Sequence, residues 1–128
     1  MRAPLASILL ATLHLGAGCE ASRLASDRVL NRDVEPDRIV LAEEISVYAK
    51  RASRTVLRSG TSWVRVGAIN EGYVYATKDQ VVVVNSFNVH EADIVLDGRE
   101  IVGFFTKLEH QFIPARRSEV VFRRVDEE

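Results

Sequence analysis

Residues 92–108 read ADIVLDGREIVGFFTKL, and this stretch indicates an antiparallel fold. Two largely apolar runs, 92–96 and 99–108, flank the dipeptide Asp97-Gly98. That dipeptide is a typical tight-turn sequence between paired strands. The stretch therefore predicts a β-hairpin, the clearest in the chain.

Other segments predict further strands. Residues 62–69, SWVRVGAI, alternate between two sets of side chains, as a half-buried strand does, and the loop NEG at 70–72 leads into a returning strand at 73–77. Residues 80–87, QVVVVNSF, carry a run of valines, which predicts a strand covered on both faces. Residues 118–125, SEVVFRRV, predict the last strand.

Residues 33–60 carry a different period. Their apolar side chains recur at spacings of four, three, four and four: Leu41, Ile45, Tyr48, Ala52 and Val56. That spacing predicts one face of a helix, which Gly60 would end. The chain is thus expected to form an α+β domain at 33–128, with one N-terminal amphipathic helix packed on an antiparallel meander of five to six strands.

Composition excludes several function classes. The chain has 128 residues, enough for one domain, and a formal net charge of −1, which gives no general attraction for nucleic acid. It contains no phosphate-binding loop, dinucleotide fingerprint or nucleophile elbow. We therefore expect a protein that is not an enzyme and has no cofactor.

The densest polar stretch between predicted strands is NSFNVHEADIV at 85–95. His90 and Glu91 begin a possible zinc-protease motif, but Ile94 stands where the second histidine would be. A site that adds Asp93 and the distant pair Glu109/His110 is conceivable, yet we expect no metal. The stretch is interpreted as a strand-connecting loop. Either its Asn side chains only bond to the loop's own backbone, or the loop contacts a partner through Asn88 and His90.

Aromatic residues supply a second candidate surface. Trp63, Tyr73 and Tyr75 lie on the two strands predicted around the loop at 70–72, where they either form a partner-binding face or pack in the core. The sequence leaves both alternatives open.

Two function classes remain for the whole protein. One is a non-catalytic accessory or assembly module that binds an envelope protein. The other is an exported small-molecule-binding or enzyme-inhibitor domain that uses the Asn85–Asp93 loop.

The N-terminus has the three parts of an export signal. Met1-Arg2 is positively charged, an apolar run follows, and residues 16–18 are small. The run is shorter than the roughly 20 residues that a stable membrane-spanning helix needs. Cys19, the only cysteine of the chain, comes directly after it.

This arrangement resembles a bacterial lipoprotein signal. Ala17 and Gly18 precede Cys19 as the small residues of a lipobox do, and the aliphatic Leu15 stands one place earlier than the family pattern has it. The resemblance implies a signal peptide at 1–18, lipidation of Cys19, a tether at 19–32 and a membrane anchor. Glu20 after that cysteine favours the outer membrane in a Gram-negative host.

Two alternatives to lipidation remain open. An ordinary signal peptide would be cut after Ala17 or Ala21 and would leave Cys19 incidental. A buried amphipathic helix would use the same apolar run inside a fold.

Overall fold

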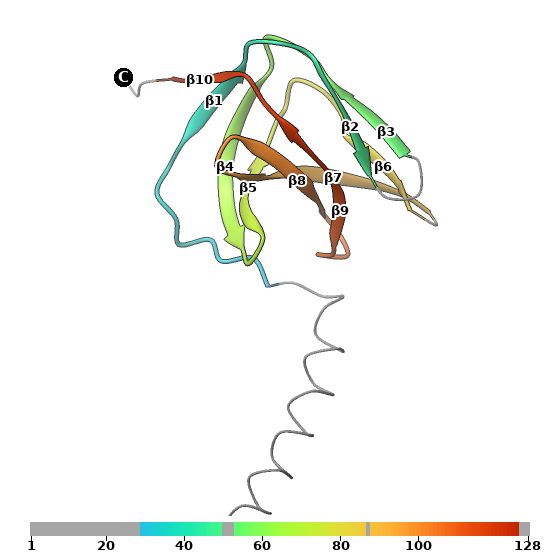
Figure 1. Cartoon of the computed structure of the whole chain (residues 1–128). Coiled ribbons are helices and arrows are strands. Elements are labelled where there is room, and N and C mark those ends of the chain that lie inside the picture. The colour runs from blue at the N-terminus through green and yellow to red at the C-terminus, as the bar shows by residue number, and fades with distance from the viewer. Residues whose placement is uncertain (1–28, 50–52, 87, 126–128) are drawn as a thin grey trace, which may run out of the picture.

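The computed structural model describes residues 29–49, 53–86 and 88–125, and these residues form an all-β structure without a helix (Figure 1). Ten antiparallel strands belong to one large sheet. The strands are β1 (Arg38–Leu41), β2 (Ile45–Ala49), β3 (Ser53–Leu57), β4 (Ser62–Ile69), β5 (Gly72–Ala76), β6 (Val83–Ser86), β7 (Asn88–Asp97), β8 (Glu100–Thr106), β9 (Phe112–Glu119) and β10 (Phe122–Arg124). The predicted α+β class is therefore wrong.

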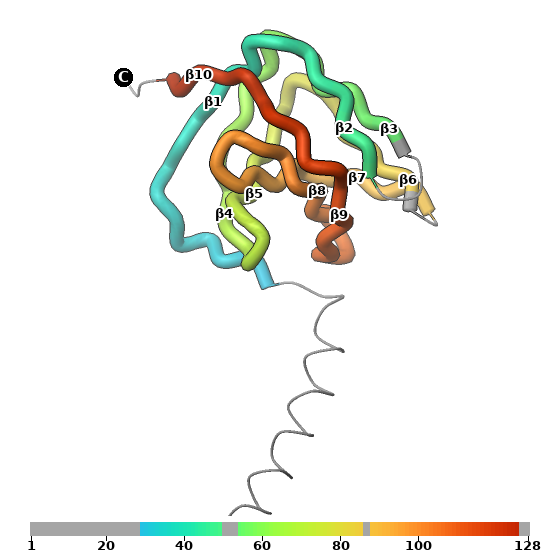
Figure 2. The backbone as a smooth tube through the Cα atoms, viewed as in Figure 1, coloured from blue at the N-terminus to red at the C-terminus, as the bar shows by residue number. Residues whose placement is uncertain are grey.

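The sheet curls back on itself at both ends. Its strands are ordered β10-β1-β4-β5-β7-β8-β9-β2-β3, and β6 pairs separately with the first part of β7. Strands β9 and β10 follow each other closely in the chain. Because β9 pairs with β2 and β10 pairs with β1, this part of the chain runs from the β2 side of the sheet to its β1 end (Figure 2). At the other end β3 lies beside β6, where the Thr55 hydroxyl donates to the Val83 carbonyl oxygen at 3.1 Å. The side-chain amide of Gln80, just before β6, also donates to the Val56 carbonyl oxygen of β3 at 3.0 Å.

Both central hairpins are confirmed. Strand β4 has the predicted bounds, and β5 returns after a turn at 70–71. A Cβ atom on Gly72 would lie 2.2 Å from the Leu96 carbonyl oxygen, so only glycine fits beside β7. In the β7–β8 hairpin Asp97 pairs with Glu100, and Gly98 opens the turn with φ 65°.

The helix predicted for 33–60 is wrong. Its described residues form β1, β2 and β3, with 50–52 outside the described part. The pairs Ile39/Leu41 and Val47/Ala49 are buried, which is the period of two expected of a strand. Leu41 is also a member of the predicted helical face, but Tyr48 of that face is substantially exposed. The spacing of three and four arose because apolar residues of successive short strands fell in step with a helical period.

The sheet is buried on both faces at its centre. Inside the curl, a large cluster gathers around Trp63 and Phe104. On the outer face of the same strands a smaller cluster contains Val74, Val95 and Phe105. Burial on both sides explains why the sequence of β7 and β8 is almost continuously apolar.

The segment before β1 covers part of that outer cluster. Asn31 and Ala68 exchange two backbone hydrogen bonds, of 2.9 and 2.8 Å, so the segment lies along β4 (Figure 1). Leu30 packs against the outer cluster. A Cβ atom on Gly67 would lie 2.6 Å from Leu30 Cδ1 and 2.8 Å from the Asn31 carbonyl oxygen, so this glycine makes room for the segment.

Candidate functional site

The structure does not bring the predicted aromatic residues together on one surface. Trp63 is fully buried, and its indole N–H donates to the Thr61 hydroxyl at 2.8 Å. Tyr75 is also buried. Tyr73 is partly exposed, with the Arg65 guanidinium 3.7 Å from its ring centre. Two of the three aromatics therefore belong to the core, which is the alternative that the sequence left open. Cys19 lies outside the described residues.

Tyr75 belongs to a hydrogen-bonded cluster that links strands β4, β5 and β10 to the segment before β1. Its hydroxyl donates to Asp37 Oδ2 at 2.6 Å and accepts from Arg65. Arg124 contacts the other oxygen of Asp37 at 3.2 Å. Burial alone would raise the pKa of Asp37, but the Tyr75 hydroxyl and the two guanidinium groups outweigh it and hold the pKa below its usual value. The complete pairing of this carboxylate gives it a structural role.

The described residues of the predicted polar loop at 85–95 lie in strands instead, at the end of β6 and in β7. Asn88 begins β7 and is exposed, and His90 lies further along the strand with its side chain mostly buried. The preceding valine run is also covered on one face only, since Val82 and Val84 are buried and their neighbours are not. The two-sided burial predicted for residues 80–87 is therefore wrong.

An exposed apolar surface results on the β6–β7 hairpin. Val81 is 71% exposed, Val83 39% and Val89 68%. Val83 pairs with Glu91, and Asn85 pairs with Val89, so these side chains share the outer face of the hairpin. We call Val81, Val83 and Val89 the hairpin valines.

The histidines and acids considered for a metal do not converge. His90 Nδ1 lies 3.2 Å from Glu109 Oε2 without a well-aligned hydrogen bond, while Asp93 pairs with Lys107 and the His110 ring stacks on Phe105. Among residues 29–49, 53–86 and 88–125, no three His, Cys, Asp or Glu side chains are placed to hold a metal ion.

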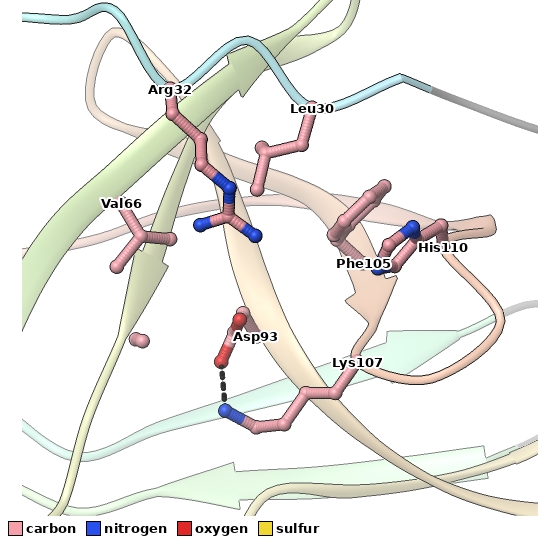
Figure 3. A pocket seen from close by; sticks show the side chains of 8 residues that line it. Leu30, Arg32, Val66, Asp93, Phe105, Lys107 and His110 are labelled. Carbon is pink, nitrogen blue, oxygen red and sulfur yellow. Dashed lines mark ion pairs between the residues drawn. The ribbon is translucent and has the colours of Figure 1, made fainter.

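A pocket of about 230 Å3 opens on the outer face of the sheet, between the segment before β1 and strands β7 and β8 (Figure 3). It is lined by Leu30, Arg32, Val66, Ala76, Asp93, Phe105, Lys107 and His110. The Phe105 and His110 rings stack with their centres 5.6 Å apart, and His110 has φ 58°. That backbone conformation is uncommon for a residue with a side chain, and the ring stack accompanies it at the rim of the pocket.

A partly exposed ion pair forms one wall of this pocket. Lys107 Nζ lies 2.8 Å from Asp93 Oδ1, and the Asp93 side chain is largely hidden from solvent. Burial raises the pKa of Asp93, and the Lys107 ammonium only partly opposes this shift. Asp93 therefore differs from Asp37, because its surroundings disfavour the ionised form. Perturbed carboxyl groups of this kind are more frequent at functional sites than elsewhere.

Arg32 enters the same pocket from the opposite wall (Figure 3). Asn31, the residue before Arg32, is held to β4 by its backbone hydrogen bonds with Ala68. The Asn31 side-chain oxygen also accepts a hydrogen bond from the Asp33 N–H at 3.0 Å. Arg32 is the middle residue of that local turn. It makes no hydrogen bond or ion pair in the part of the chain that the structure describes.

Sequence reasoning missed most of this pocket. It named Asp93 and His110 only as conceivable metal ligands and did not single out Arg32 or Lys107. The segment that contributes Arg32 was interpreted as a tether. The signal available in the sequence was Gly67, a glycine inside a strand, because such a glycine often marks the close approach of another backbone.

Comparison with known proteins finds no matching family model, no similar curated protein and no similar solved structure. Within the described ranges, no helix has the length and apolar character needed to cross a membrane.

Proposed function

We propose that this protein is a bacterial envelope lipoprotein, anchored through lipidated Cys19, whose domain binds another envelope protein and has no catalytic role. The observation that carries the binding role is the exposed apolar surface of the hairpin valines. Asn88, singled out from the sequence as a partner contact, is exposed beside this surface at the start of β7.

The hairpin has the composition of a small interaction surface. Val83 and Val89 lie on adjacent strands and Val81 stands just before β6, while Asn85 and Glu91 are the directly paired polar residues on the same face. Clustered apolar exposure of this kind marks interaction sites more often than scattered single residues do. In the proposed complex, the partner covers this face of the hairpin.

The anchor is supported by the signal-like residues 1–18 and by the position of the sole cysteine. More than one acyl chain is needed for stable anchoring, and lipoprotein maturation supplies them on one cysteine. In a Gram-negative host we expect the outer membrane, because Glu20 follows Cys19.

Intact-mass spectrometry of the protein made in a bacterial host tests the anchor. The expected mature species begins at Cys19 and carries acyl chains, and the Cys19→Ala variant lacks it. A mature chain without lipid, or an uncut Met1, would contradict the anchor.

Photo-crosslinking in cells tests the partner. A photoreactive side chain at position 88 should give one discrete crosslinked product. Val89→Lys should abolish the product, because it places a charge in the apolar surface. The matched control is Val121→Lys, which alters another exposed valine outside the hairpin. A product that survives Val89→Lys as well as it survives the control would contradict the proposed surface.

A further inference from the structure

The pocket between the segment before β1 and strands β7 and β8 has an excess of positive charge. Arg32 and Lys107 are its two cations, and Asp93 is its one carboxylate. Asp93 and Lys107 already form an ion pair at 2.8 Å. The Arg32 guanidinium faces the same pocket but makes no hydrogen bond or ion pair with any described residue, so the pocket keeps a net charge of one positive unit (Figure 3).

We propose that this pocket binds a small organic carboxylate, with the carboxylate on Arg32 and the apolar body against Leu30, Val66 and Phe105. The site lies on a different part of the molecule from the hairpin valines and does not depend on the function proposed for them. A planar guanidinium matches a carboxylate with two parallel hydrogen bonds, which makes Arg32 the suitable partner for such a head group.

The charge balance favours one negative charge on the ligand. Arg32 supplies one uncompensated positive charge, because Lys107 is shared with Asp93. A phosphate monoester would bring more negative charge, and the buried carboxylate of Asp93 would repel the excess. A monoanionic carboxylate is neutralised by Arg32 alone and leaves the Asp93–Lys107 pair intact.

The size and lining of the pocket limit the rest of the ligand. Its volume of about 230 Å3 equals roughly eight waters at about 30 Å3 each. A carboxylate on one aromatic ring or a short branched chain is of that size, whereas a nucleotide is too large. Phe105 and Val66 offer apolar contact on the sheet side, and Leu30 offers it from the covering segment (Figure 3).

Titration of the purified full chain with sodium benzoate tests the proposal, with benzamide as the neutral molecule of the same shape. Backbone amide NMR signals report binding. Benzoate is expected to shift the signals of Phe105 and Lys107 in a saturable manner, and benzamide is expected to bind far more weakly. Inorganic phosphate tests the head group alone and is expected to bind more weakly than benzoate.

Two arginine variants make the test specific to the pocket. Arg32→Gln is expected to weaken benzoate binding about tenfold, which corresponds to about 1.4 kcal/mol, because it removes the charge that holds the carboxylate. Arg123→Gln removes an equal charge from an exposed position of β10 outside the lining and should leave the affinity unchanged. Both positions are exposed, so both variants should fold.

Several results would overturn the proposal. Equal affinity for benzamide and benzoate would show that charge plays no part. Equal affinity of the two arginine variants would show that Arg32 does not hold the ligand. Tighter binding of phosphate than of benzoate, or no saturable shift with benzoate, would also refute a carboxylate site.

Discussion

Gly67→Ala should detach the segment before β1 from the sheet while leaving the sheet itself folded. The added Cβ would lie 2.6 Å from Leu30 Cδ1 and 2.8 Å from the Asn31 carbonyl oxygen. Real Cβ atoms essentially never approach other atoms so closely, and the second contact is with backbone, which cannot rotate away. The segment must therefore move outward, and its two hydrogen bonds to Ala68 must break.

The contacts that hold the segment set the size of the effect. Two backbone hydrogen bonds contribute about 1 kcal/mol each, and the partial burial of Leu30 contributes about 1 kcal/mol more. Replacing glycine by alanine also lowers the entropy of the unfolded chain, which returns up to about 1 kcal/mol. The free energy of unfolding should therefore fall by about 2 kcal/mol, and the melting temperature of a domain this size by about 10 °C.

Hydrogen exchange at one amide separates this mechanism from general destabilisation. The Ala68 N–H donates to the Asn31 carbonyl oxygen at 2.8 Å, so its protection depends on the docked segment. Loss of about 3 kcal/mol of docking free energy should speed its exchange by on the order of a hundredfold. The control is Gly98→Ala, where φ is 65° but no atom lies within 4 Å of the added Cβ. It should destabilise the turn without exposing Ala68.

Unchanged protection of Ala68 in the Gly67→Ala variant would refute the reasoning, because the sheet would then have absorbed the methyl group in another way. A Leu30→Ala substitution in the same background adds a second check. Since both changes act on the same docked segment, their effects on stability should be less than additive.

Three further substitutions test other parts of the structure. Thr61→Val removes the acceptor of the buried Trp63 indole N–H and should lower the free energy of urea unfolding by about 1–3 kcal/mol; an unchanged value would mean that another acceptor takes over. Because the folded pKa of Asp37 is lowered, its stabilising contribution is present above about pH 4 and is lost as the pH falls through the folded pKa. Asp37→Asn should therefore flatten the acid limb of a plot of unfolding free energy against pH, and a limb of unchanged slope would contradict the ion-paired cluster. The folded pKa of Asp93 is raised, so its contribution has the opposite sign: it is present at acid pH and is lost as the pH rises through the folded pKa. The stability of Asp93→Asn relative to the unchanged protein should accordingly improve between pH 4 and pH 7, and equal differences at the two pH values would contradict the burial of an ionised carboxyl group.

The hairpins were predictable from sequence because their information is local. Asp97-Gly98 fixes a turn between two apolar runs, and the turn at 70–71, which was expected to extend to 72, does the same for β4 and β5. In both cases a glycine stands where a backbone conformation or a close approach requires it. Residues within reach of such a turn pair with one another whatever the rest of the chain does.

The strands at 38–57 were mispredicted for two reasons. Strands β2 and β3 pair with each other, but residues 50–52 between them (KRA) include no typical turn residue. The other partners of these strands are distant in sequence. Strand β1 pairs with β10 and β4, and β2 reaches β9 at Ala49 and Ala115. No turn residue inside 38–57 indicates these pairings. The prediction therefore rested on the spacing of the apolar residues alone, and that spacing matched the period of a helix. The β-branched residues Ile39 and Val47 favoured a strand, but strand propensity depends strongly on context.

The pocket was less predictable still, because its two walls come from segments that are far apart in the sequence. Arg32 precedes the first strand, whereas Asp93 and Lys107 belong to the hairpin that decides the fold. They meet only because Gly67 lets the segment before β1 lie on the sheet. A ligand that contacts both walls must bind the docked form more tightly than the detached form, so ligand binding and docking stabilise each other by the same free energy. If Cys19 is the anchor, the residues between it and Leu30 span at most about 40 Å when extended. The segment that would hold the domain near the membrane would then also form one wall of its pocket. A pull on the anchor that detaches the segment would therefore weaken ligand binding, and a bound ligand would oppose that detachment.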